Sequence, residues 1–327
     1  MNGARVLIVG GGGMLGRKLA RRLLAQGRIG KRPLGSVHLV DLKAPEIADL
    51  GTAASAEAVD IVAGDLDGLL ARRAPDYIFH LAAIVSGEAE QNFPLGYAVN
   101  VEGTRRLLEA ARLAANRPRF VFSSSLAVFG GRLPDIVPDS QRTTPQSSYG
   151  AQKAIGELLV ADYARKAYVD GVALRLPTIV VRPGAPNKAA SSFLSSILRE
   201  PLAGKDAVLP VADDVAAWIA SPGIAIQSLI HAAEIDMATL GADHALTGRG
   251  ITVTAGEMLD ALSRVAGAKA VARVRRSPDD TIARIVGSWP RAFACDAATR
   301  FGFPVDESID AIIRAYIDEE LSGIVVA

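Results

Sequence analysis

The sequence feature that most constrains the fold is a run of four glycines close to the N-terminus. The glycines at 10–13 follow the apolar stretch Ala4–Val9 and precede Met14–Gln26, where leucines recur at helical spacing. A short strand, a glycine turn and an amphipathic helix in this order are typical of the first unit of a parallel α/β sheet. Glycine permits the tight turn, and the helix N-terminus offers free N–H groups to an anion. The chain is therefore predicted to begin with a phosphate-binding turn.

Four adjacent glycines leave two possible spacings for this turn. One is Gly11-x-Gly13-x-x-Gly16, and the other is Gly10-x-x-Gly13-x-x-Gly16. In both, the backbone can approach the pyrophosphate of a dinucleotide at the start of the helix. A glycine-rich turn without a ligand is the alternative. The residues predicted to contact the pyrophosphate are Gly10, Gly13, Met14, Leu15 and Gly16.

The following residues continue the alternation of short apolar stretches with helical patterns. Residues 27–36 are rich in Gly, Arg and Lys and are predicted to form a loop. Several of the expected strands are apolar on both faces, as a sheet covered by helices on both sides requires. The fold class is therefore predicted to be α/β, with a Rossmann-type doubly wound parallel sheet. Strands are expected at 37–42, 60–63, 77–83, 119–123 and 172–181, and helices at 101–115 and 149–168.

The pattern changes after Arg182, where prolines interrupt the chain and no regular strand–helix alternation continues. A chain of 327 residues, half of them apolar, is long enough for one large domain with a lobe or for two domains. We expect residues 1–181 to form the dinucleotide-binding Rossmann domain. Residues 182–327 are expected to form mainly a smaller C-terminal substrate-binding lobe, with some later segments returning to the first domain.

Composition excludes several classes of partner. The formal net charge is +1, which gives no indication of a nucleic-acid partner. Cys295 is the only cysteine, so no internal disulfide is possible, as expected for a reducing cytoplasm. No apolar stretch approaches the ~20 residues that cross a membrane, and the N-terminus does not resemble a signal peptide. The four histidines lack ligand spacing. A soluble, cytoplasmic protein without a metal is therefore expected.

Two acidic residues after predicted strands are candidates for contacts with the cofactor. Asp41 lies at the end of the second predicted strand, where a carboxylate can bind the adenosine ribose and repel a 2′-phosphate. This favours NAD over NADP, although Lys43 follows closely and a surface Asp ending a strand is the alternative. Asp65 follows the third predicted strand and is expected near the adenine.

The stretch Tyr149-Gly150-Ala151-Gln152-Lys153 carries the candidate catalytic pair. Residues i and i+4 share one face of a helix, so the phenol of Tyr149 and the ammonium of Lys153 would point the same way. A free tyrosine has a pKa near 10, and a nearby cation lowers it by stabilising the phenolate. The pair therefore predicts a general base that is tuned toward neutral pH.

A run of serines supports this assignment. Ser123, Ser124 and Ser125 end a predicted parallel strand, and ligands bind at the carboxyl ends of such strands. A serine hydroxyl there can hold a substrate oxygen while the tyrosine takes its proton. A lone serine could equally cap a helix or form a turn, so the prediction depends on the whole set in this order.

In these motifs the chain resembles the extended short-chain dehydrogenases/reductases, the NAD-dependent epimerase/dehydratase family. Two small departures are Val9 and Phe129, where the family usually has Thr and Tyr. The matching residues span about the first 180 and are Gly10, Gly13, Gly16, Asp41, Asp65-Leu66, Leu81-Ala82-Ala83, Asn100-Val101-Glu102-Gly103-Thr104, Ser123-Ser124-Ser125, Val128-Phe129-Gly130, Tyr149, Lys153 and Arg175-Leu176-Pro177-Thr178.

The resemblance implies a role for each matching residue. It makes Ser125 the site serine and Tyr149 the base. Lys153 lowers the pKa of Tyr149 and holds the nicotinamide ribose. The loop that starts at Pro177 flanks the nicotinamide. The remaining residues implied to bind NAD are Leu66, Leu81, Ala82, Ala83, Asn100, Ser123 and Thr178.

The substrate is less constrained by the sequence. Arg182, Asn187 and Lys188 could hold a carboxylate or phosphate, although solvated loop residues need no such role. Ser86 and Trp218 are candidate pocket residues, and core packing is an equal alternative for Trp218. Only 5% of the chain is aromatic, and no aromatic and arginine set for clamping a nucleotide sugar is evident.

Three segments resemble those of the D-erythronate dehydrogenases, which oxidise carbon 2 of a four-carbon sugar acid with NAD: residues 175–188, the Ala-Ser-Ser-Phe segment that follows them, and residues 215–218. The similarity extends over nearly the whole chain. This resemblance implies a small sugar-acid substrate, and it leaves D-erythronate, L-threonate and uronates open. One alternative is a nucleotide-sugar epimerase with tightly bound NAD. Another is a non-catalytic NAD-sensing protein on the same fold, which would be expected to have lost the Tyr or the Lys. A homodimer is expected by resemblance, through helices that include the Tyr-Lys helix.

Overall fold

A computed structural model describes residues 3–184, 191–236, 239, 244–287 and 289–326. Its contacts divide the chain into two compact units, and neither is continuous in sequence. The first unit comprises Met1–Val128, Pro145–Leu176 and Ile226–Gly248. The second unit comprises Phe129–Thr144, Pro177–Ala225 and Arg249–Ala327. The expectation that residues 1–181 bind NAD and that residues 182–327 mainly bind the substrate stays a prediction.

The first unit is built on one eight-stranded sheet in the order β12-β8-β6-β5-β1-β3-β2, with β4 pairing with β3. All pairs are parallel except β2 with β3. The order reverses at β1, so the carboxyl ends of β1 and its neighbours β3 and β5 face a ligand-binding position. The predicted Rossmann-type sheet is thereby confirmed. The strands are β1 (Ala4–Val9), β2 (Arg28–Ile29), β3 (Arg32–Asp41), β4 (Ala54–Ala58), β5 (Tyr77–His80), β6 (Arg119–Ser125), β8 (Asp170–Leu176) and β12 (Ala245–Thr247).

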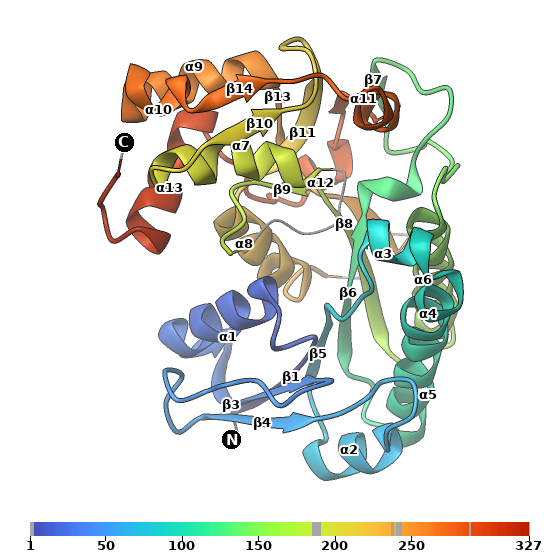
Figure 1. Ribbon diagram of the computed structural model, residues 1–327. Coiled ribbons are helices and arrows are strands. Elements are labelled where there is room, and N and C mark those ends of the chain that lie inside the picture. Colours follow the sequence, from blue (N-terminus) through green and yellow to red (C-terminus); the bar gives the residue numbers. More distant parts are fainter. Residues whose placement is uncertain (1–2, 185–190, 237–238, 240–243, 288, 327) are drawn as a thin grey trace. The chain divides into compact units, whose positions relative to one another are not determined.

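Helices cover both faces of this sheet (Figure 1). Helix α1 packs on one face, and α2, α5 and α6 pack on the other. The second face holds a core in which Phe120 and Phe122 of β6 meet Leu107 and Leu108 of α5. The helices are α1 (Met14–Gln26), α2 (Leu66–Arg73), α3 (Ser86–Gln91), α4 (Phe93–Gly96), the π-helical η1 (Tyr97–Gly103), α5 (Thr104–Ala114), the 3₁₀ turn η2 (Leu126–Val128), α6 (Ser148–Arg165) and α8 (Pro222–Ala232), which spans both units.

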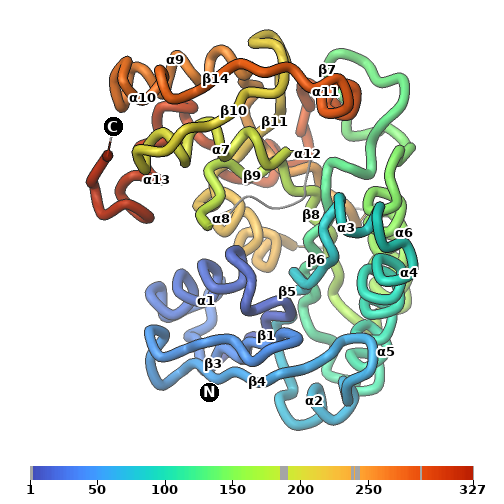
Figure 2. Tube along the Cα trace, viewed as in Figure 1, coloured from blue at the N-terminus to red at the C-terminus, as the bar shows by residue number. Residues whose placement is uncertain are grey.

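The third strand of the sheet is not where the sequence analysis expected it. Residues 60–63 form a turn, in which the Asp60 side chain accepts a hydrogen bond from the Val62 N–H at 2.7 Å. Ile61 is buried in the core beneath α5 and Val62 is half-buried against it, whereas Ala63 is exposed. Arg106 of α5 donates to the Ile61 carbonyl at 3.1 Å. The strand is β4, which runs beside β3 and leads to α2 (Figure 2).

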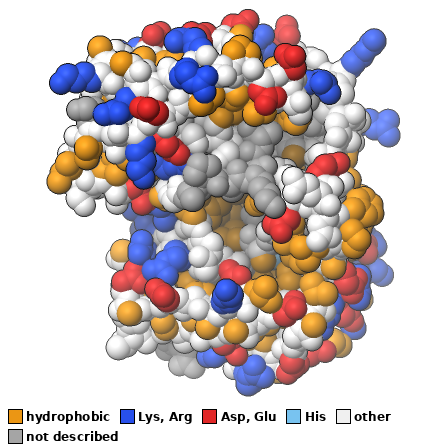
Figure 3. All heavy atoms as spheres, in the orientation of Figure 1, with side chains coloured by type: hydrophobic (Ala, Val, Ile, Leu, Met, Phe, Trp, Pro, Cys, Tyr) orange, Lys and Arg blue, Asp and Glu red, His pale blue; other side chains and the backbone are white. Residues whose placement is uncertain are grey.

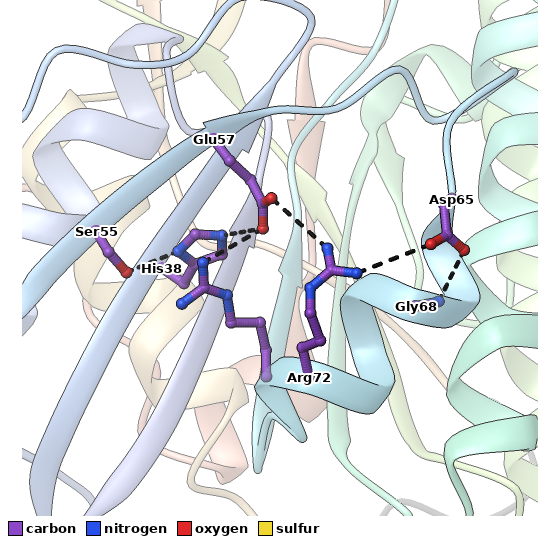
Figure 4. Close-up of polar contacts among 7 residues, drawn as sticks. His38, Ser55, Glu57, Asp65, Gly68 and Arg72 are labelled. Atoms are coloured by element: carbon purple, nitrogen blue, oxygen red, sulfur yellow. Dashed lines mark hydrogen bonds and ion pairs between the residues drawn. The ribbon is translucent and has the colours of Figure 1, made fainter.

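The strand β4 was missed because its sequence, three alanines with Ser55 and Glu57, has no pattern of large apolar residues. The two polar side chains of β4 form hydrogen bonds with His38, which is buried in the neighbouring strand β3. The His38 ring binds Ser55 Oγ through Nδ1 at 2.7 Å and Glu57 Oε1 through Nε2 at 2.8 Å (Figure 4). Burial lowers the pKa of His38. Glu57 also pairs with Arg73 at 3.5 Å, so this polar cluster explains a strand without an apolar pattern.

The predicted loop at 27–36 is also wrong. The chain turns back at Gly30, whose φ is 56°, and pairs β2 with the start of β3 in an antiparallel ladder. The strand β3 therefore begins at Arg32, five residues before the predicted start at 37. The charged and glycine residues that suggested a loop lie at the exposed end of this hairpin.

The second unit consists of small sheets packed against helices. A three-stranded sheet has the order β13-β11-β9, and β10 with β14 and β7 with β15 form parallel pairs. Its core gathers residues such as Ile197, Met258 and Ile313 from three helices. The elements are β7 (Ile136–Val137), β9 (Thr178–Ile179), α7 (Ser192–Leu202), β10 (Ala207–Leu209), β11 (Ala216–Ala220), β13 (Ile251–Thr254), α9 (Ala255–Ala266), α10 (Ala268–Ala272), β14 (Val274–Arg276), α11 (Asp280–Gly287), β15 (Ala292–Phe293), α12 (Asp296–Arg300) and α13 (Ile309–Glu320).

None of the helices formed by the described residues is both long and apolar enough to pass through a membrane. The described part of the chain also contains no group of three or more His, Cys, Asp or Glu side chains placed to hold a metal ion.

Candidate active site

The glycine turn lies at the carboxyl end of β1, packed tightly between two other parts of the sheet. The N–H groups of Gly10 and Gly11 both donate to the Val40 carbonyl of β3 at 2.9 Å. Gly10 has a φ of 87°, and a Cβ at this residue would lie 2.5 Å from the backbone nitrogen of Ala82. A Cβ on Gly16 would collide with the Gly10 carbonyl. Glycine is therefore required at both ends of the turn.

Helix α1 presents free donors above this turn. The N-cap residue of α1 is Gly13, which has no side chain that could accept a hydrogen bond from the first N–H groups of the helix. The first turn of α1, all of which the structure describes, contains no acidic residue. The N–H groups and the helix dipole are thus available to an anion. Asp41, at the end of β3, accepts from the Gly12 N–H at 3.0 Å through Oδ2. The turn, the uncapped helix and Asp41 together fit the pyrophosphate and ribose of a dinucleotide.

The segment after β5 forms the opposite wall of the glycine turn. Leu81 and Ala82 both donate their N–H groups to the Val9 carbonyl, at 2.8 and 2.9 Å. These residues and Ala83 are half-buried, and Ser86 begins α3 shortly after them. The structure therefore brings Leu81 and Ala82 next to Gly10.

Asp65 serves a local structural purpose in addition to its predicted adenine contact. It is the N-cap of α2, because its Oδ1 accepts from the Gly68 N–H at 2.8 Å (Figure 4). Its Oδ2 lies 3.8 Å from the Arg72 guanidinium, and the side chain is largely exposed. Leu66 is buried in the core. A contact between Asp65 and adenine remains a prediction.

The three predicted catalytic side chains lie together in the first unit. Burial raises the pKa of Tyr149, and a hydrogen bond with the Ser125 hydroxyl partly opposes that rise, so the two hydroxyls are neighbours. The Lys153 ammonium lies 5.6 Å from the centre of the Tyr149 ring. It also donates to the Ser123 carbonyl at 2.8 Å. The i, i+4 spacing on α6 therefore places both groups at the carboxyl end of β6.

Burial strongly affects the protonation of this pair in the protein without ligands. It raises the pKa of Tyr149 to about 12 and lowers the pKa of Lys153 to about 7. The carboxylate of Glu157 opposes the second shift. Burial disfavours the charged form of each group, so it favours the neutral phenol of Tyr149 and the neutral amine of Lys153. Additional positive charge near the phenol is needed before Tyr149 can act as a base near neutral pH.

A buried ion pair lies directly behind the catalytic set. Glu157 receives two hydrogen bonds from Arg175 of β8, at 2.9 and 2.8 Å. It also accepts from the Ser124 hydroxyl. The carboxylate thus joins α6, β6 and β8 beside Lys153. Sequence reasoning missed Glu157, although its i+4 spacing from Lys153 places it on the same helix face.

Asn100 has a structural contact that its motif did not reveal. Its side chain is buried in η1 and exchanges two hydrogen bonds with the backbone of Ile84, at 2.8 and 3.0 Å. A third bond joins it to Gln152 of α6 at 2.7 Å. Ser123 is similarly occupied, because its hydroxyl donates to the His80 carbonyl at 3.1 Å. Both residues hold neighbouring segments in place.

Four further predicted residues belong to the second unit, namely Pro177, Thr178, Arg182 and Trp218. Pro177 precedes β9, which starts at Thr178. Arg182 is half-buried, and its pKa is lowered by burial and by Arg199. Trp218 lies in β11 with its ring 5.8 Å from that of Phe293, so part of its surface packs within the unit. Asn187 and Lys188 lie outside the described residues.

Comparison with known proteins gives one family and several full-length relatives. The model of the NAD dependent epimerase/dehydratase family matches residues 6–231. A D-erythronate dehydrogenase from Cupriavidus necator is 46% identical over 323 residues, which cover 96% of this chain and 98% of the relative. A D-erythronate dehydrogenase from Haemophilus influenzae is 42% identical over 318 residues, covering 97% of this chain and all of the relative.

A solved structure is similar over almost the whole chain. It is the structure of a nucleoside-diphosphate-sugar epimerase from Agrobacterium tumefaciens, with 47% sequence identity and a TM-score of 0.95. The match covers 99% of this chain and 96% of the other. A UDP-glucose 4-epimerase from Mycolicibacterium smegmatis is 39% identical over 167 residues, which cover about half of each chain.

Proposed function

Because the chain belongs to the NAD dependent epimerase/dehydratase family, we propose that it oxidises carbon 2 of a four-carbon sugar acid, converting D-erythronate to 2-oxo-D-erythronate. Family membership makes the protein an NAD-dependent oxidoreductase. The observation that carries the substrate proposal is similarity above 40% along nearly the full length of two D-erythronate dehydrogenases. Such similarity includes the C-terminal half, in which enzymes of this fold differ most in substrate.

The residues that would hold NAD follow from the geometry of the first unit. Gly10 and Gly16 allow the turn to pack closely against its own backbone and that of Ala82. The turn would then present the uncapped start of α1, at Gly13, to the pyrophosphate. Asp41 would bind the adenosine ribose, and Lys153 the nicotinamide ribose. When bound, NAD supplies the hydride acceptor and a positively charged nicotinamide ring.

The chemistry of the reaction falls to Ser125, Tyr149 and Lys153. Ser125 holds the hydroxyl oxygen on carbon 2, and Tyr149 as phenolate removes the hydroxyl proton. The hydrogen on the same carbon leaves as hydride, so the carbon becomes a carbonyl and two electrons go to the cofactor. Lys153 as ammonium favours the phenolate, and the Glu157 carboxylate raises the pKa of Lys153 against the effect of burial.

An anionic substrate is supported by Arg182. Among the described residues, its guanidinium donates to Ser191 Oγ at 3.3 Å, and no carboxylate pairs with it. A partly buried guanidinium without an acidic partner is suited to bind a carboxylate. Ser86, Asn187, Lys188 and Trp218 are proposed as further substrate contacts. The second unit would thus act mainly in substrate binding, and the first in NAD binding.

Nucleotide-sugar epimerisation is the second candidate. It is favoured by the 47% identity to the nucleoside-diphosphate-sugar epimerase from Agrobacterium tumefaciens. Such an enzyme would use the same three side chains but return the hydride to its product. NAD would then remain bound through the cycle, and no net NADH would accumulate.

The proposal is tested by absorbance at the NADH band with purified protein, NAD and a panel of D-erythronate, L-threonate and uronates. We expect NADH to accumulate with D-erythronate. Absence of NADH with every acid, together with interconversion of a UDP-sugar, would instead establish the epimerase.

Two tyrosine variants test the proposed base. Tyr149→Phe should lower kcat by at least about 100-fold, a typical contribution of a general base, while NAD still binds. Tyr168→Phe makes the same change at a partly exposed tyrosine after α6 and should leave turnover intact. Loss of NAD binding in Tyr149→Phe would show a folding defect rather than loss of a base.

A homodimer is also part of the proposal, as the family resemblance implies. Helices α5 and α6 pack side by side and carry exposed leucines, Leu113 and Leu158, on their outer surface. Leu158 is 72% exposed and Leu113 53% exposed. A second copy of the chain would cover these side chains.

A further inference from the structure

Gln152 is a buried amide in the middle of the catalytic helix, with no role in the proposed chemistry. It lies in α6 between Tyr149 and Lys153, and its side chain is completely buried. A buried polar side chain must be hydrogen-bonded or it destabilises the fold. The contacts of this amide therefore indicate why the chain keeps glutamine here.

The hydrogen bonds around Asn100 determine how the Gln152 amide is oriented. The Ile84 N–H can only donate, so the atom 2.8 Å from it must be Asn100 Oδ1. Asn100 Nδ2 then donates one hydrogen to the Ile84 carbonyl at 3.0 Å and the other toward Gln152 at 2.7 Å. The Gln152 atom that receives it must be Oε1. The orientation of both amides thus follows from donors and acceptors alone.

The other end of the Gln152 amide, Nε2, has no hydrogen-bond partner among the described residues. It is seated against Gly96, where a Cβ would lie 2.6 Å from Nε2. A buried donor without a partner is costly. Asparagine or serine at this position would be too short to reach Asn100. The hydrogen bond that Oε1 accepts from Asn100 therefore explains why glutamine is present, even though its Nε2 has no partner among the described residues.

The irregular helix that carries Asn100 supports the same interpretation. Residues Tyr97–Gly103 form a π-helical segment between α4 and α5, and both α4 and η1 contact α6. Such segments widen a helix locally and are frequent at functional sites. Here the segment holds Asn100 between the backbone after β5 and the catalytic helix.

We propose that Gln152 is a positioning residue that couples the NAD-binding turn to the catalytic helix through Asn100. The connection runs from Gly10, which contacts Ala82, to the backbone of Ile84, then to Asn100 and to Gln152. Every link is a hydrogen bond or a backbone contact within the first unit. It sets the separation between the segment after β5 and the face of α6 that carries Tyr149 and Lys153.

The test replaces the amide while keeping its length. Gln152→Met cannot accept the Asn100 hydrogen bond. We expect about a 10-fold lower kcat, since small misplacements of catalytic groups are costly. We also expect about a 5-fold higher dissociation constant for NAD, titrated by calorimetry. Gln152→Glu retains an acceptor oxygen and should keep the NAD dissociation constant within about 3-fold of the unmodified protein.

Two further variants make the result specific. Gln91→Met makes the same change at an exposed glutamine in α3 and should alter neither quantity. In Gly96→Ala the added methyl group of α4 would collide with the Gln152 amide. This variant should therefore also raise the dissociation constant for NAD, as Gln152→Met does. It also provides a second variant if Gln152→Met folds poorly.

Two results would overturn the proposal. In one, Gln152→Met lowers the melting temperature but changes neither NAD affinity nor kcat, which would make the residue purely structural. In the other, Gln152→Glu binds NAD as weakly as Gln152→Met, so the acceptor is not the cause. The kcat measurement rests on the proposed function, whereas the NAD titration does not. Failure of the sugar-acid assay therefore leaves the test of Gln152 intact.

Discussion

At the scale of single residues, the polar groups buried beneath the site constrain one another. The Thr104 hydroxyl donates to the Asn100 carbonyl at 2.7 Å, so it can only accept from the His80 ring, 2.8 Å away. His80 must therefore carry its hydrogen on Nε2. In the part of the chain that the structure describes, His80 Nδ1 has no hydrogen-bond partner. Burial, together with the charge of Lys153, lowers the pKa of His80 to about 3.

This histidine gives the protein a predictable sensitivity to acid. An unfolded chain protonates His80 near pH 6.5, whereas the folded chain does so only near 3. The folded pKa is the lower one, so stability is complete above pH 6.5 and falls as the pH decreases toward 3. The loss for this group is roughly 2 kcal/mol between pH 7 and pH 5.

The prediction is tested with His80→Gln, which retains a donor for Thr104 but cannot be protonated. Urea unfolding at pH 7 and pH 5 should show a smaller decrease in the free energy of unfolding for this variant than for the unmodified protein. The comparison concerns the change with pH, so a general destabilisation by the substitution does not affect it. Equal decreases in both proteins would contradict the low pKa of His80.

At the scale of elements, the glycine turn is the most tightly constrained segment. A methyl group at Gly16 would meet the carbonyl of Gly10 and the backbone of Gly11, which cannot rotate away. Overpacking of this kind typically costs 1–3 kcal/mol. The cost falls on the turn that would hold the pyrophosphate, so cofactor binding is expected to suffer.

We therefore expect Gly16→Ala to raise the dissociation constant for NAD by about 10-fold or more. Gly287→Ala is the matched control, because a Cβ at the end of α11 meets nothing within 4 Å. It should leave NAD affinity unchanged in the same calorimetric titration. Normal NAD affinity in Gly16→Ala would show that the turn can relax, contrary to the packing described.

Elements were predicted well where the apolar pattern was strong. The strand β1 and the helix α1 have the predicted bounds, and α6 begins one residue from the prediction. The strand β4 was missed because pairing with β3, rather than its own composition, makes it a strand. Residues 60–63 were wrongly predicted to form a strand, because a short apolar stretch of sequence does not by itself distinguish a turn from a strand.

At the scale of the whole molecule, charged side chains are spread over the visible surface, whereas hydrophobic side chains gather in one region of it (Figure 3). Acidic and basic side chains are interspersed over the visible face, and hydrophobic side chains gather over α3, α4 and α6 (Figure 3). Phe93 of α4 is 54% exposed and belongs to this region. An apolar surface on helices is typical of contact with another protein chain.

The proposed homodimer predicts that a charge at Leu158 disrupts association. Leu158→Asp should shift the mass measured by sedimentation from dimer to monomer, since an unpaired carboxylate is not tolerated in an apolar contact. Ile136→Asp makes a comparable change at an exposed residue of β7 in the second unit and should remain dimeric. A dimer that persists in Leu158→Asp would place the contact elsewhere.

The family, the fold class and the cofactor could all be predicted from the amino-acid sequence. These depend on local patterns, because a glycine turn between a strand and a helix has few structural solutions, and residues four apart on a helix must share a face. The family match and the parallel sheet confirm those predictions. The roles of Ser125, Tyr149 and Lys153, the substrate and the cytoplasmic location stay predictions.

Which distant residues meet around the site follows from packing alone. Glu157 binds Arg175 in strand β8, and Gln152 binds Asn100 in an irregular helix. Nothing in the local sequence requires these pairings, because each depends on how strands and helices far apart in the chain pack together. A hydrogen bond is short and directional, so a side chain's partner becomes known only when the packed geometry is known.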